Sequence, residues 1–520
     1  MKTRTRFPLL AALAVGSLAL TACAGGGTAS DGGTEITVTS AAQPPNLDPH
    51  ITQVAMVAEL TRPVYETLVT VDENYEVQPM LAESFERSED GLTYTFTLRE
   101  GVTFHDGSEL DATDVIASME RWTRLSPAGQ TDFAGATWTS PDANTVVLTV
   151  KTPSFLHLLH LSSRLLNVPV IMPSEIIEAG GDEPINEVIG TGPYTFVEWV
   201  ADQRLVLEKW DEYQSVDAPS SGLSGKKDAK IDSITYEFVT DPTTTVAGIQ
   251  TGQYDATTGL GFDSVEQLEA DPSVTLGTYQ VEPINMAYNI HSGTVSDVNI
   301  RQAINIALDR DEIMTATVGK QEYYDLVHHN MTKPWEPLWN TEVGKDTFNT
   351  ADTAKAKELL AQGGYTNQPI TLLTTGDFDT AQDSAVMVQA QLQALGMNVE
   401  VESLEWAAFI ERYLNDQDSW DLGLIPQVVK NEPTQTIGFV PGNPGYSDSD
   451  ELHALLESYR SAPTIEDAQL LYNDMQQYVE DLRPLSRLGD AHSLFATSDR
   501  VKSFPIFDST VIWWNAEMAE

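Results

Sequence analysis

Histidines are the first residues in this chain that could bind a metal or transfer a proton. Two of the nine, His157 and His160, are three residues apart, a spacing that can place two imidazoles on one face of a helix. Both lie in the leucine-rich run 156–161, where this spacing is typical of ordinary helix packing. His328 and His329 are adjacent, and the chain has no HExxH motif. The histidines therefore predict no metal site.

Motifs for nucleophilic or phosphate chemistry are equally weak. Residues 190–193 (GTGP) lack a GxGxxG continuation, and the proline removes a backbone donor, so they predict a tight turn. Residues 224–227 (SGKK) match SxxK by letter only, without the companion SDN and KTG motifs. GxSxG does not occur, and the acidic pairs are those that 77 acidic residues produce by chance. We therefore expect the protein to have no catalytic residue and no cofactor, and not to be an enzyme. A secreted hydrolase, the alternative, would need a nucleophile–base pair or a metal cluster.

Tryptophans are more informative. Several of the ten lie beside polar residues, as suits a cleft that grips a polar solute through ring faces and N–H donors, although each taken alone is also typical of core packing. These are Trp122, Trp138, Trp199, Trp406, Trp420, Trp513 and Trp514. Trp122 and Trp406 are kept as candidate ligand contacts.

Charge and length limit the classes of function. The 520 residues include 77 acidic and 29 basic side chains, for a formal net charge of −48. Nucleic-acid binding needs clustered Lys and Arg, so we expect no nucleic-acid partner. The same charge argues against a basic surface that holds anionic lipid. The length predicts more than one domain.

The N-terminus has the pattern of a secretory signal. Lys2, Arg4 and Arg6 precede the apolar run 7–20, which is too short to span a membrane. Residues 20–23 (LTAC) resemble a bacterial lipobox, which predicts a signal peptide at 1–22, lipid attachment at Cys23 and a flexible Gly-rich tether at 23–34. An incidental cysteine after a plain signal peptide is the alternative. As the chain's single cysteine, Cys23 also excludes a disulfide framework.

Local patterns predict a mixed α/β chain. Asp111 and Asp114 have a spacing like that of a capping box, ahead of a helix that buries Val115, Met119 and Trp122. Two more helices are expected at 298–308 and 354–361, and 220–230 is expected to be a surface loop. Alternating or β-rich runs predict strands at 36–39, 92–99, 145–150, 195–199, 204–208 and 234–239.

Residues 370–404 predict the clearest unit. A strand at 370–375, a helix at 381–395 ending before Gly396, and a strand at 398–404 follow in order. Strand, helix and strand over this length form a βαβ unit, whose two strands we expect to be parallel.

An ordered set of short segments resembles the solute-binding lipoproteins of ABC importers, in the large family that binds peptides, nickel complexes and related solutes. The segments run in family order along the chain. They are 45–49 (PNLDP), 64–69 (VYETLV), 79–84 (PMLAES), 95–107 (TFTLREGVTFHDG), 112–115 (ATDV), 190–194 (GTGPY), Asn289 and 300–310 (IRQAINIALDR).

The resemblance implies an α/β, two-lobed periplasmic-binding-protein-like fold with an additional domain inserted in the first lobe. The chain would cross between lobes near 279–288 and 482–492, and the lobes would close over the solute by a hinge motion. The implied division is lobe I at 35–60, 185–280 and 490–520, the inserted domain at 61–184, and lobe II at 281–489.

The implied function is to capture a peptide or peptide-like solute outside the cell membrane and deliver it to ABC permease and ATPase subunits. The protein would be a monomer attached to the membrane through its lipid alone. An oligosaccharide, a nickel-type metal chelate and a sensory role are the alternatives.

The resemblance also points to candidate ligand contacts. They are Gln43 and Pro44 before the LDP segment, Tyr288 and Asn289 at the entry to lobe II, Trp406 and Arg412, and Asn431 and Glu432 in an acid–proline turn. Peptide binders carry an amine-anchoring aspartate where this chain has Val429. Because a buried ammonium without a counter-charge is costly, a blocked or cyclic peptide or another neutral solute becomes more plausible, although Glu432, Asp421 or Glu405 could supply the charge.

Overall fold

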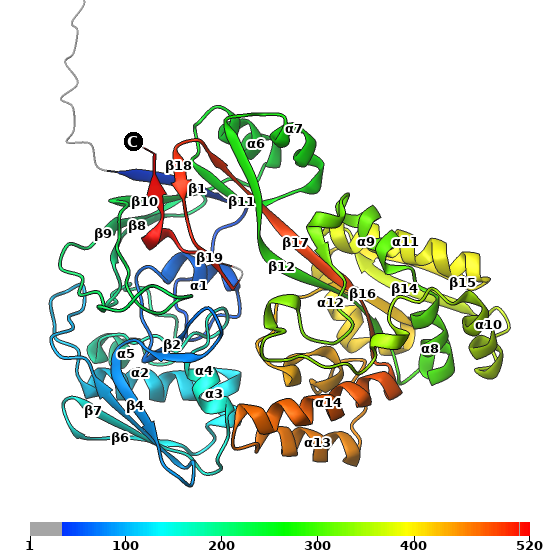
Figure 1. The fold of residues 1–520 in the computed structure, drawn as a ribbon, viewed down its shortest axis with the longest axis horizontal. Helices are drawn as coiled ribbons and strands as arrows, with labels where there is room; N and C mark the ends of the chain where they lie inside the picture. The colour runs from blue at the N-terminus through cyan, green and yellow to red at the C-terminus, as the bar shows by residue number, and fades with distance from the viewer. Residues whose placement is uncertain (1–33, 509, 520) are drawn as a thin grey trace, which may run out of the picture. The chain divides into compact units, whose positions relative to one another are not determined.

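The computed structural model describes residues 34–508 and 510–519 (Figure 1). The predicted signal peptide, the predicted lipid-attachment site at Cys23 and almost all of the predicted tether lie outside these residues. Within the described chain, no helix has the length and apolar character needed to cross a membrane.

Two long antiparallel strands, β12 (Val274–Tyr288) and β17 (Leu485–Ser498), form the centre of an eleven-stranded sheet. Their register runs from Val274 opposite Ser498 to Ala287 opposite Leu485. Figure 1 shows both strands passing from one lobe to the other, at the two crossings that the sequence predicts. The other strands are β1 (Glu35–Ser40), β8 (Tyr194–Val200), β9 (Arg204–Lys209), β10 (Ser233–Phe238), β11 (Ala256–Leu260), β13 (Tyr324–Asp325), β14 (Pro369–Thr375), β15 (Asn398–Leu404) and β16 (Leu422–Pro426).

The strand order assigns the sheet to two lobes. The order is β15-β14-β16-β12-β17-β11-β1-β10-β9-β8, with β13 paired to β17 off this path. The first lobe is built around β1 and β8 to β11, and the second around β14 to β16. The mixed α/β, two-lobed fold that the sequence predicts is confirmed.

Helices cover both lobes. They are α1 (Ala55–Thr61), α2 (Ala112–Leu125), α3 (Pro127–Asp132), α4 (Leu156–Leu161), α5 (Ser174–Gly180), α6 (Pro242–Gln250), α7 (Val265–Glu269), α8 (Val298–Ala307), α9 (Arg310–Val318), α10 (Thr353–Gln362), α11 (Asp379–Leu395), α12 (Trp406–Asn415), α13 (Asp450–Arg460) and α14 (Ile465–Leu482).

A separate four-stranded antiparallel sheet marks the additional domain of the first lobe. Its order is β4-β5-β7-β6, from β4 (Ala82–Arg87), β5 (Thr93–Leu98), β6 (Thr137–Asp142) and β7 (Thr145–Thr149). Helix α2 packs on it, and Val115, Met119 and Trp122 on this helix are fully buried, as predicted. Three two-stranded sheets complete the fold: β2 (Val69–Val71) with β3 (Val77–Pro79), β18 (Val501–Ser503) with β21 (Glu517–Met518), and β19 (Ile506–Phe507) with β20 (Thr510–Val511).

The start of α2 is set by its own residues. Asp111 accepts a hydrogen bond from the backbone N–H of Thr113, and Asp114 accepts one from the backbone N–H of Asp111 at 3.0 Å. This reciprocal capping satisfies amide groups that have no partner inside the helix. The capping box predicted from the Asp111–Asp114 spacing is confirmed.

The βαβ prediction is also confirmed. Strands β14 and β15 pair in parallel from Pro369–Asn398 to Thr375–Leu404, with α11 between them in the chain. Helix α11 buries Ala385, Val388 and Leu392 against the sheet, as its apolar spacing predicts.

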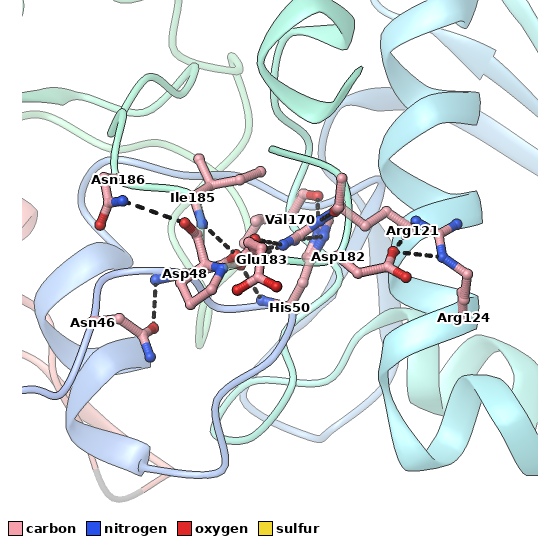
Figure 2. A network of polar contacts seen from close by, with 12 residues as sticks. Asn46, Asp48, His50, Arg121, Arg124, Val170, Asp182, Glu183, Ile185 and Asn186 are labelled. Carbon is pink, nitrogen blue, oxygen red and sulfur yellow. Dashed lines mark hydrogen bonds and ion pairs between the residues drawn. The ribbon is translucent and has the colours of Figure 1, made fainter. Parts of the chain in front are cut away.

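A buried polar network joins the loop after β1 to α2 (Figure 2). The Arg121 guanidinium donates to both carboxylate oxygens of Asp48, at 2.7 and 3.2 Å, and both side chains are fully buried. Asp48 also accepts from the backbone N–H groups of His50 and Ile185, at 3.0 Å each. The aspartate of the LDP segment therefore acts as a structural tie.

The prediction that 220–230 is a surface loop is wrong in part. Lys227 is 6% exposed, and its ammonium lies 2.7 Å from the Glu66 carboxylate inside the first lobe. Leu223 and Ala229 are buried as well. The polar composition of this segment predicts exposure, but the Lys227–Glu66 ion pair buries part of it in the first lobe.

Candidate functional site

A cavity of about 360 Å³ lies where the two lobes meet. The first lobe contributes Trp122 from α2, part of α3, His160 from α4, and the segment 163–167. The second lobe contributes Trp335, the segment 429–432 and the short turns that follow it, and Arg460 at the end of α13. Asp508, near the C-terminus, completes one wall.

An ion pair sits on the first-lobe wall. His160 Nε2 lies 3.0 Å from Asp132 Oδ2, and the two side chains are 5% and 14% exposed. Burial alone would lower the pKa of His160, but the Asp132 carboxylate 3.0 Å away outweighs this effect and raises that pKa above its usual value. Burial opposes ionisation of Asp132 too, yet the His160 contact holds its pKa below the usual range. Both shifts favour the charged pair over the neutral one.

Arg164 lies between the lobes. Its Nε donates to Asp508 Oδ2 at 2.6 Å, and its guanidinium carbon stands 4.8 Å from the ring centre of Trp335 and 5.4 Å from that of Tyr75. The Arg164 and Asp508 side chains are 4% and 2% exposed. Stacking on aromatic faces and one buried carboxylate fix the guanidinium at the cavity wall.

The acid–proline turn forms the opposite wall. Glu432 is 2% exposed, and its two carboxylate oxygens accept from the backbone N–H and the hydroxyl of Thr434, at 2.8 and 2.6 Å. Burial raises the pKa of Glu432. The backbone carbonyl of Asn431 accepts from Trp339 Nε1 at 3.0 Å, while Asn431 Oδ1 is buried without a hydrogen-bond partner.

Three sequence-predicted residues border this cavity: Trp122, Asn431 and Glu432. Trp122 is fully buried, and its Nε1 donates to the Asn167 carbonyl at 2.5 Å, so its N–H group is already in use. Val429, at the position of the missing aspartate, lines the cavity as well. The role of the three in ligand binding stays a prediction.

The other predicted contacts lie elsewhere in the described chain. Gln43 forms two hydrogen bonds with Asp202, one to its carboxylate at 2.6 Å and one from its backbone N–H at 2.9 Å. Pro44 is buried beside it in the loop after β1. Neither belongs to the lining of the interlobe cavity.

Tyr288 and Asn289 lie at the end of β12 and are fully buried. The Tyr288 hydroxyl is 2.7 Å from Ser486 Oγ, and Asn289 Nδ2 donates to the Trp420 carbonyl at 3.0 Å. These contacts hold the second lobe together where the chain enters it. They do not reach the cavity lining.

Trp406 and Arg412 lie on α12 in the second lobe. Trp406 is half-buried and stacks on Phe409, with ring centres 5.6 Å apart. Arg412 donates to Ser419 Oγ and the Ser419 carbonyl at 2.9 Å each. Both are outside the lining of the cavity, and contact with a solute stays a prediction for them.

Of the three carboxylates proposed to replace the missing aspartate, Glu432 alone borders the cavity. Asp421 accepts from the backbone N–H groups of Thr294 and Thr371 at 2.8 and 3.0 Å. Glu405 is the exposed residue before the first turn of α12.

Sequence reasoning missed Arg164, Trp335 and Asp508. Each stands alone in its segment, in the runs SSRLL, KPWEP and IFDST, and lacks a motif. Arg164 and Asp508 are 344 positions apart in the chain, so no local sequence pattern could predict their pairing. His160 pairs with Asp132 across the first-lobe wall, and among the described residues no group of three potential metal ligands forms.

Comparison with known proteins identifies the family to which this chain belongs. A family model for bacterial extracellular solute-binding proteins, family 5 (middle region), matches residues 76–440. A probable peptide ABC transporter periplasmic-binding protein of Sinorhizobium fredii, y4tO, is 26% identical over 470 residues, which cover 85% of this chain and 86% of that one. The glutathione-binding protein GsiB of Pectobacterium atrosepticum is 27% identical over 373 residues, covering 69% and 67%.

Solved structures share the fold. The substrate-binding protein CtaP of Listeria monocytogenes superimposes with a TM-score of 0.81 at 22% identity, over 94% of this chain and 100% of that one. The periplasmic binding protein DppA of Helicobacter pylori, solved with the peptide STSA, gives 0.73 at 22% identity over 94% and 98%. Since the family model covers well over half of the sequence, the chain belongs to the bacterial extracellular solute-binding proteins of family 5.

Proposed function

We propose that this protein captures a peptide or peptide-like solute in the interlobe cavity, as the extracytoplasmic component of an ABC importer. Family membership and the names of the two relatives, a peptide ABC transporter binding protein and a glutathione-binding protein, support the solute class. The nickel-type alternative is not favoured, because neither of these relatives is named for a metal.

The observation that carries the proposal is the composition of the cavity. About 360 Å³ of space is bordered by tryptophans and by charged side chains of both signs, drawn from both lobes. Ligand sites of this size combine apolar walls with a few placed polar groups. Because both lobes contribute to the walls, a bound solute would favour their closure over it.

The remaining parts of the proposal concern the protein's setting. The solute would be released unchanged to permease and ATPase subunits, without chemical turnover. A lipid on Cys23, after removal of residues 1–22, would hold a monomer at the outer face of the cell membrane. Mass spectrometry of the N-terminal peptide from native membranes tests this anchor: a peptide that starts before Cys23, or an unmodified Cys23, would contradict it.

We also propose the domain division at the residues predicted above: lobe I at 35–60, 185–280 and 490–520, the inserted domain at 61–184, and lobe II at 281–489. Support comes from the four-stranded sheet β4-β5-β7-β6, whose strands all fall within 61–184. The core formed by Val115, Phe96 and Leu148 also stays inside this range.

Native mass spectrometry of the protein as purified, followed by a thermal-shift panel, tests the solute class. The panel contains di- to pentapeptides, glutathione, oligosaccharides and nickel chelates. A peptide at 100 times its dissociation constant should add about 2.7 kcal/mol to the free energy of unfolding. A stabilising oligosaccharide or stoichiometric nickel, with no response to peptides, would overturn the proposal. A sensory role would instead leave uptake of the identified solute unchanged when the gene is deleted.

A further inference from the structure

One hydrophobic cluster of this protein contains side chains from both lobes. The first lobe contributes Tyr75, Leu156 and Leu159, all within the proposed inserted domain. The second lobe contributes Trp335 and Trp339, which are both fully buried. Because separation of the lobes would expose part of this cluster to water, it is unfavourable whether or not a solute is bound.

Tyr75 is the residue through which the inserted domain contacts Trp335. The two ring centres are 4.2 Å apart, and the ring centre of Phe507 is 5.2 Å from that of Tyr75. The Arg164 guanidinium stands over both Tyr75 and Trp335, at the distances given above. Aromatic pairs and cation–π contacts of this kind stabilise beyond the area that they bury. Trp335 of the second lobe thus fits against a stack that belongs to the first.

The backbone of Tyr75 has a conformation that a bulky residue rarely adopts. Its φ of 63° lies in the left-handed region, which favours glycine. Tyr75 belongs to the loop between β2 and β3, where Asp72 Oδ1 accepts from the backbone N–H groups of Asn74 and Glu76, at 2.9 and 3.1 Å. Such strain persists only where the surrounding structure maintains it, and it marks positions whose side chain has a function. The contact with Trp335 supplies that function.

A second contact between the lobes lies at the turn between α13 and α14. The backbone N–H of Phe155 donates to the Ala462 carbonyl at 3.1 Å, and Arg87 Nη1 donates to the next carbonyl, that of Pro463, at 2.6 Å. Both donors belong to the inserted domain, and Figure 1 shows α13 and α14 next to this domain. Two successive carbonyls of the second lobe are therefore bound by the inserted domain.

The protein makes these contacts with its own groups alone. Tyr75, Arg87 and Phe155 do not belong to the lining of the interlobe cavity. Their contacts with the second lobe therefore favour the closed arrangement equally with and without solute. A solute can shift the equilibrium between open and closed arrangements only by its own difference in affinity for the two.

We propose that the inserted domain is a clasp that keeps the lobes closed in the protein without solute. The clasp consists of Tyr75 stacked on Trp335 and of the two hydrogen bonds from Phe155 and Arg87 to the α13–α14 turn. A solute then enters and leaves only during brief openings, so that the clasp limits the rate of exchange. This regulation goes beyond the proposed function and does not depend on the class of solute.

Small-angle X-ray scattering of residues 23–520 without lipid tests the resting arrangement. Bound solute is first removed by unfolding in guanidinium chloride and refolding, and native mass spectrometry verifies that the mass is that of the chain alone. We expect a radius of gyration equal to the value calculated from this structure. A larger radius would overturn the clasp, while the proposed function, which requires only that a solute bind, would stand.

Tyr75→Gly tests the stack. Glycine removes the ring and suits the left-handed backbone, so the inserted domain should keep its fold. We expect hydrogen exchange of the Phe155 amide to be about tenfold faster without solute, because opening of the lobes releases this N–H from the Ala462 carbonyl. Unchanged exchange at Phe155 would overturn the role of the stack. Equal acceleration at the amides inside α2 would show that Tyr75 supports the fold of the domain, and would overturn its role in the clasp as well.

Asn367→Gly is the matched control for Tyr75→Gly. Asn367 is also a left-handed residue, with a φ of 86°, but it is exposed in the second lobe, between α10 and β14. Its replacement should leave exchange of the Phe155 amide unchanged. The same acceleration in both variants would contradict an effect specific to the stack.

Arg87→Ala tests the second contact without changing the stack. It should also accelerate exchange of the Phe155 amide, because the hydrogen bonds of Arg87 and Phe155 hold the same turn. Arg124→Ala is the control: it removes another arginine of the inserted domain, but one that pairs with Asp182 of the same lobe. If both variants or neither accelerated this exchange, the hydrogen bond from Arg87 to Pro463 would have no part in the clasp.

Discussion

Arg121 and Asp48 form a doubly hydrogen-bonded ion pair whose side chains are both fully buried. The pair ties the loop after β1 to helix α2, two segments 73 residues apart in the chain. The Arg121 donors also reach the Gly181 and Glu183 carbonyls at 2.7 and 2.9 Å. The aspartate of the LDP segment therefore has a structural role: it joins the inserted domain, through α2, to the rest of the first lobe.

Replacing Asp48 with Ala should lower the free energy of unfolding by about 3–5 kcal/mol, because the Arg121 charge would stay buried without a counter-charge. Urea unfolding followed by circular dichroism measures the change.

Asp182→Ala is the control for this effect. Asp182 pairs with Arg124 on the same helix at 2.6 Å, but the Arg124 and Asp182 side chains are 50% and 62% exposed (Figure 2). An exposed pair contributes at most about 1 kcal/mol. Similar losses for the two variants would contradict a structural role specific to Asp48.

Trp122→Ala and Trp406→Ala should separate a core tryptophan from a peripheral one. Trp122 is fully buried and donates its N–H to the Asn167 carbonyl, so its truncation should cost about 3–5 kcal/mol of unfolding free energy. Trp406→Ala should lower the free energy of unfolding by less, because Trp406 is only half-buried and its truncation leaves a smaller cavity. Thermal unfolding of the unliganded variants measures the difference.

The same two variants test a ligand role for Trp406. If it contacts solute, Trp406→Ala should weaken binding while the unliganded melting temperature stays nearly unchanged. A large loss of unliganded stability with unaltered affinity would identify Trp406 as a packing residue.

Local structure was predictable because its causes are local. The alternation of residues 398–404 sets strand β15 with the predicted bounds, and the Asp111–Asp114 spacing sets the start of α2. Each depends on a few neighbouring residues whose periodicity or capping chemistry is visible in the sequence.

The cavity could be predicted only in part. Asn431 and Glu432 could be predicted because their turn resembles a family segment. Arg164, Trp335 and Asp508 meet only after both lobes have folded, and no periodicity connects them. Lys227 shows the opposite failure: a polar segment predicts exposure, yet a single buried partner, Glu66, reverses it.

The ion pair of His160 and Asp132 predicts a pH dependence of stability. The pKa of His160 is raised in the folded protein, so its contribution is fully present below the unfolded value of 6.5 and is lost as pH rises through the folded pKa. The lowered pKa of Asp132 makes its contribution present above 3.8 and lost as pH falls through the folded pKa. The stabilisation lost in His160→Gln should thus be greatest at mildly acidic pH and shrink toward alkaline pH. Urea unfolding across this range measures it.

His157 offers a control of opposite sign on the same helix. Burial lowers its pKa to about 4, so protonation of the unfolded chain should destabilise the wild type as pH falls below 6.5. Relative to wild type, His157→Gln should therefore gain stability toward acidic pH. If both variants showed the same slope, the titration of His160 would not be the cause of the His160→Gln effect.

The Phe155 side chain forms an aromatic contact between the two lobes, and we expect this contact to stabilise their closed arrangement. From the first lobe, its ring contacts Tyr459 and Trp339 of the second, with ring centres 5.3 and 6.0 Å apart. Its backbone N–H donates to the Ala462 carbonyl at 3.1 Å, a bond that substitution of the side chain leaves possible. Since an aromatic pair contributes about 0.5–1.5 kcal/mol beyond its buried area, Phe155→Ala should shift the lobes toward an open arrangement about tenfold. Small-angle X-ray scattering should then show a larger radius of gyration without solute, and a return to the wild-type value at saturating solute.

Phe85→Ala controls for the loss of an aromatic contact as such. Phe85 pairs with Phe96 inside the four-stranded sheet of the first lobe, with ring centres 6.3 Å apart, and makes no aromatic contact with the second lobe among the described residues. Its truncation should reduce stability without changing the radius of gyration. Opening is coupled to binding, because a solute that favours the closed arrangement must supply the free energy that Phe155 no longer contributes. Phe155→Ala should therefore also bind solute more weakly, mainly through faster release; an unchanged radius together with unchanged affinity would show that the aromatic contact does not control closure.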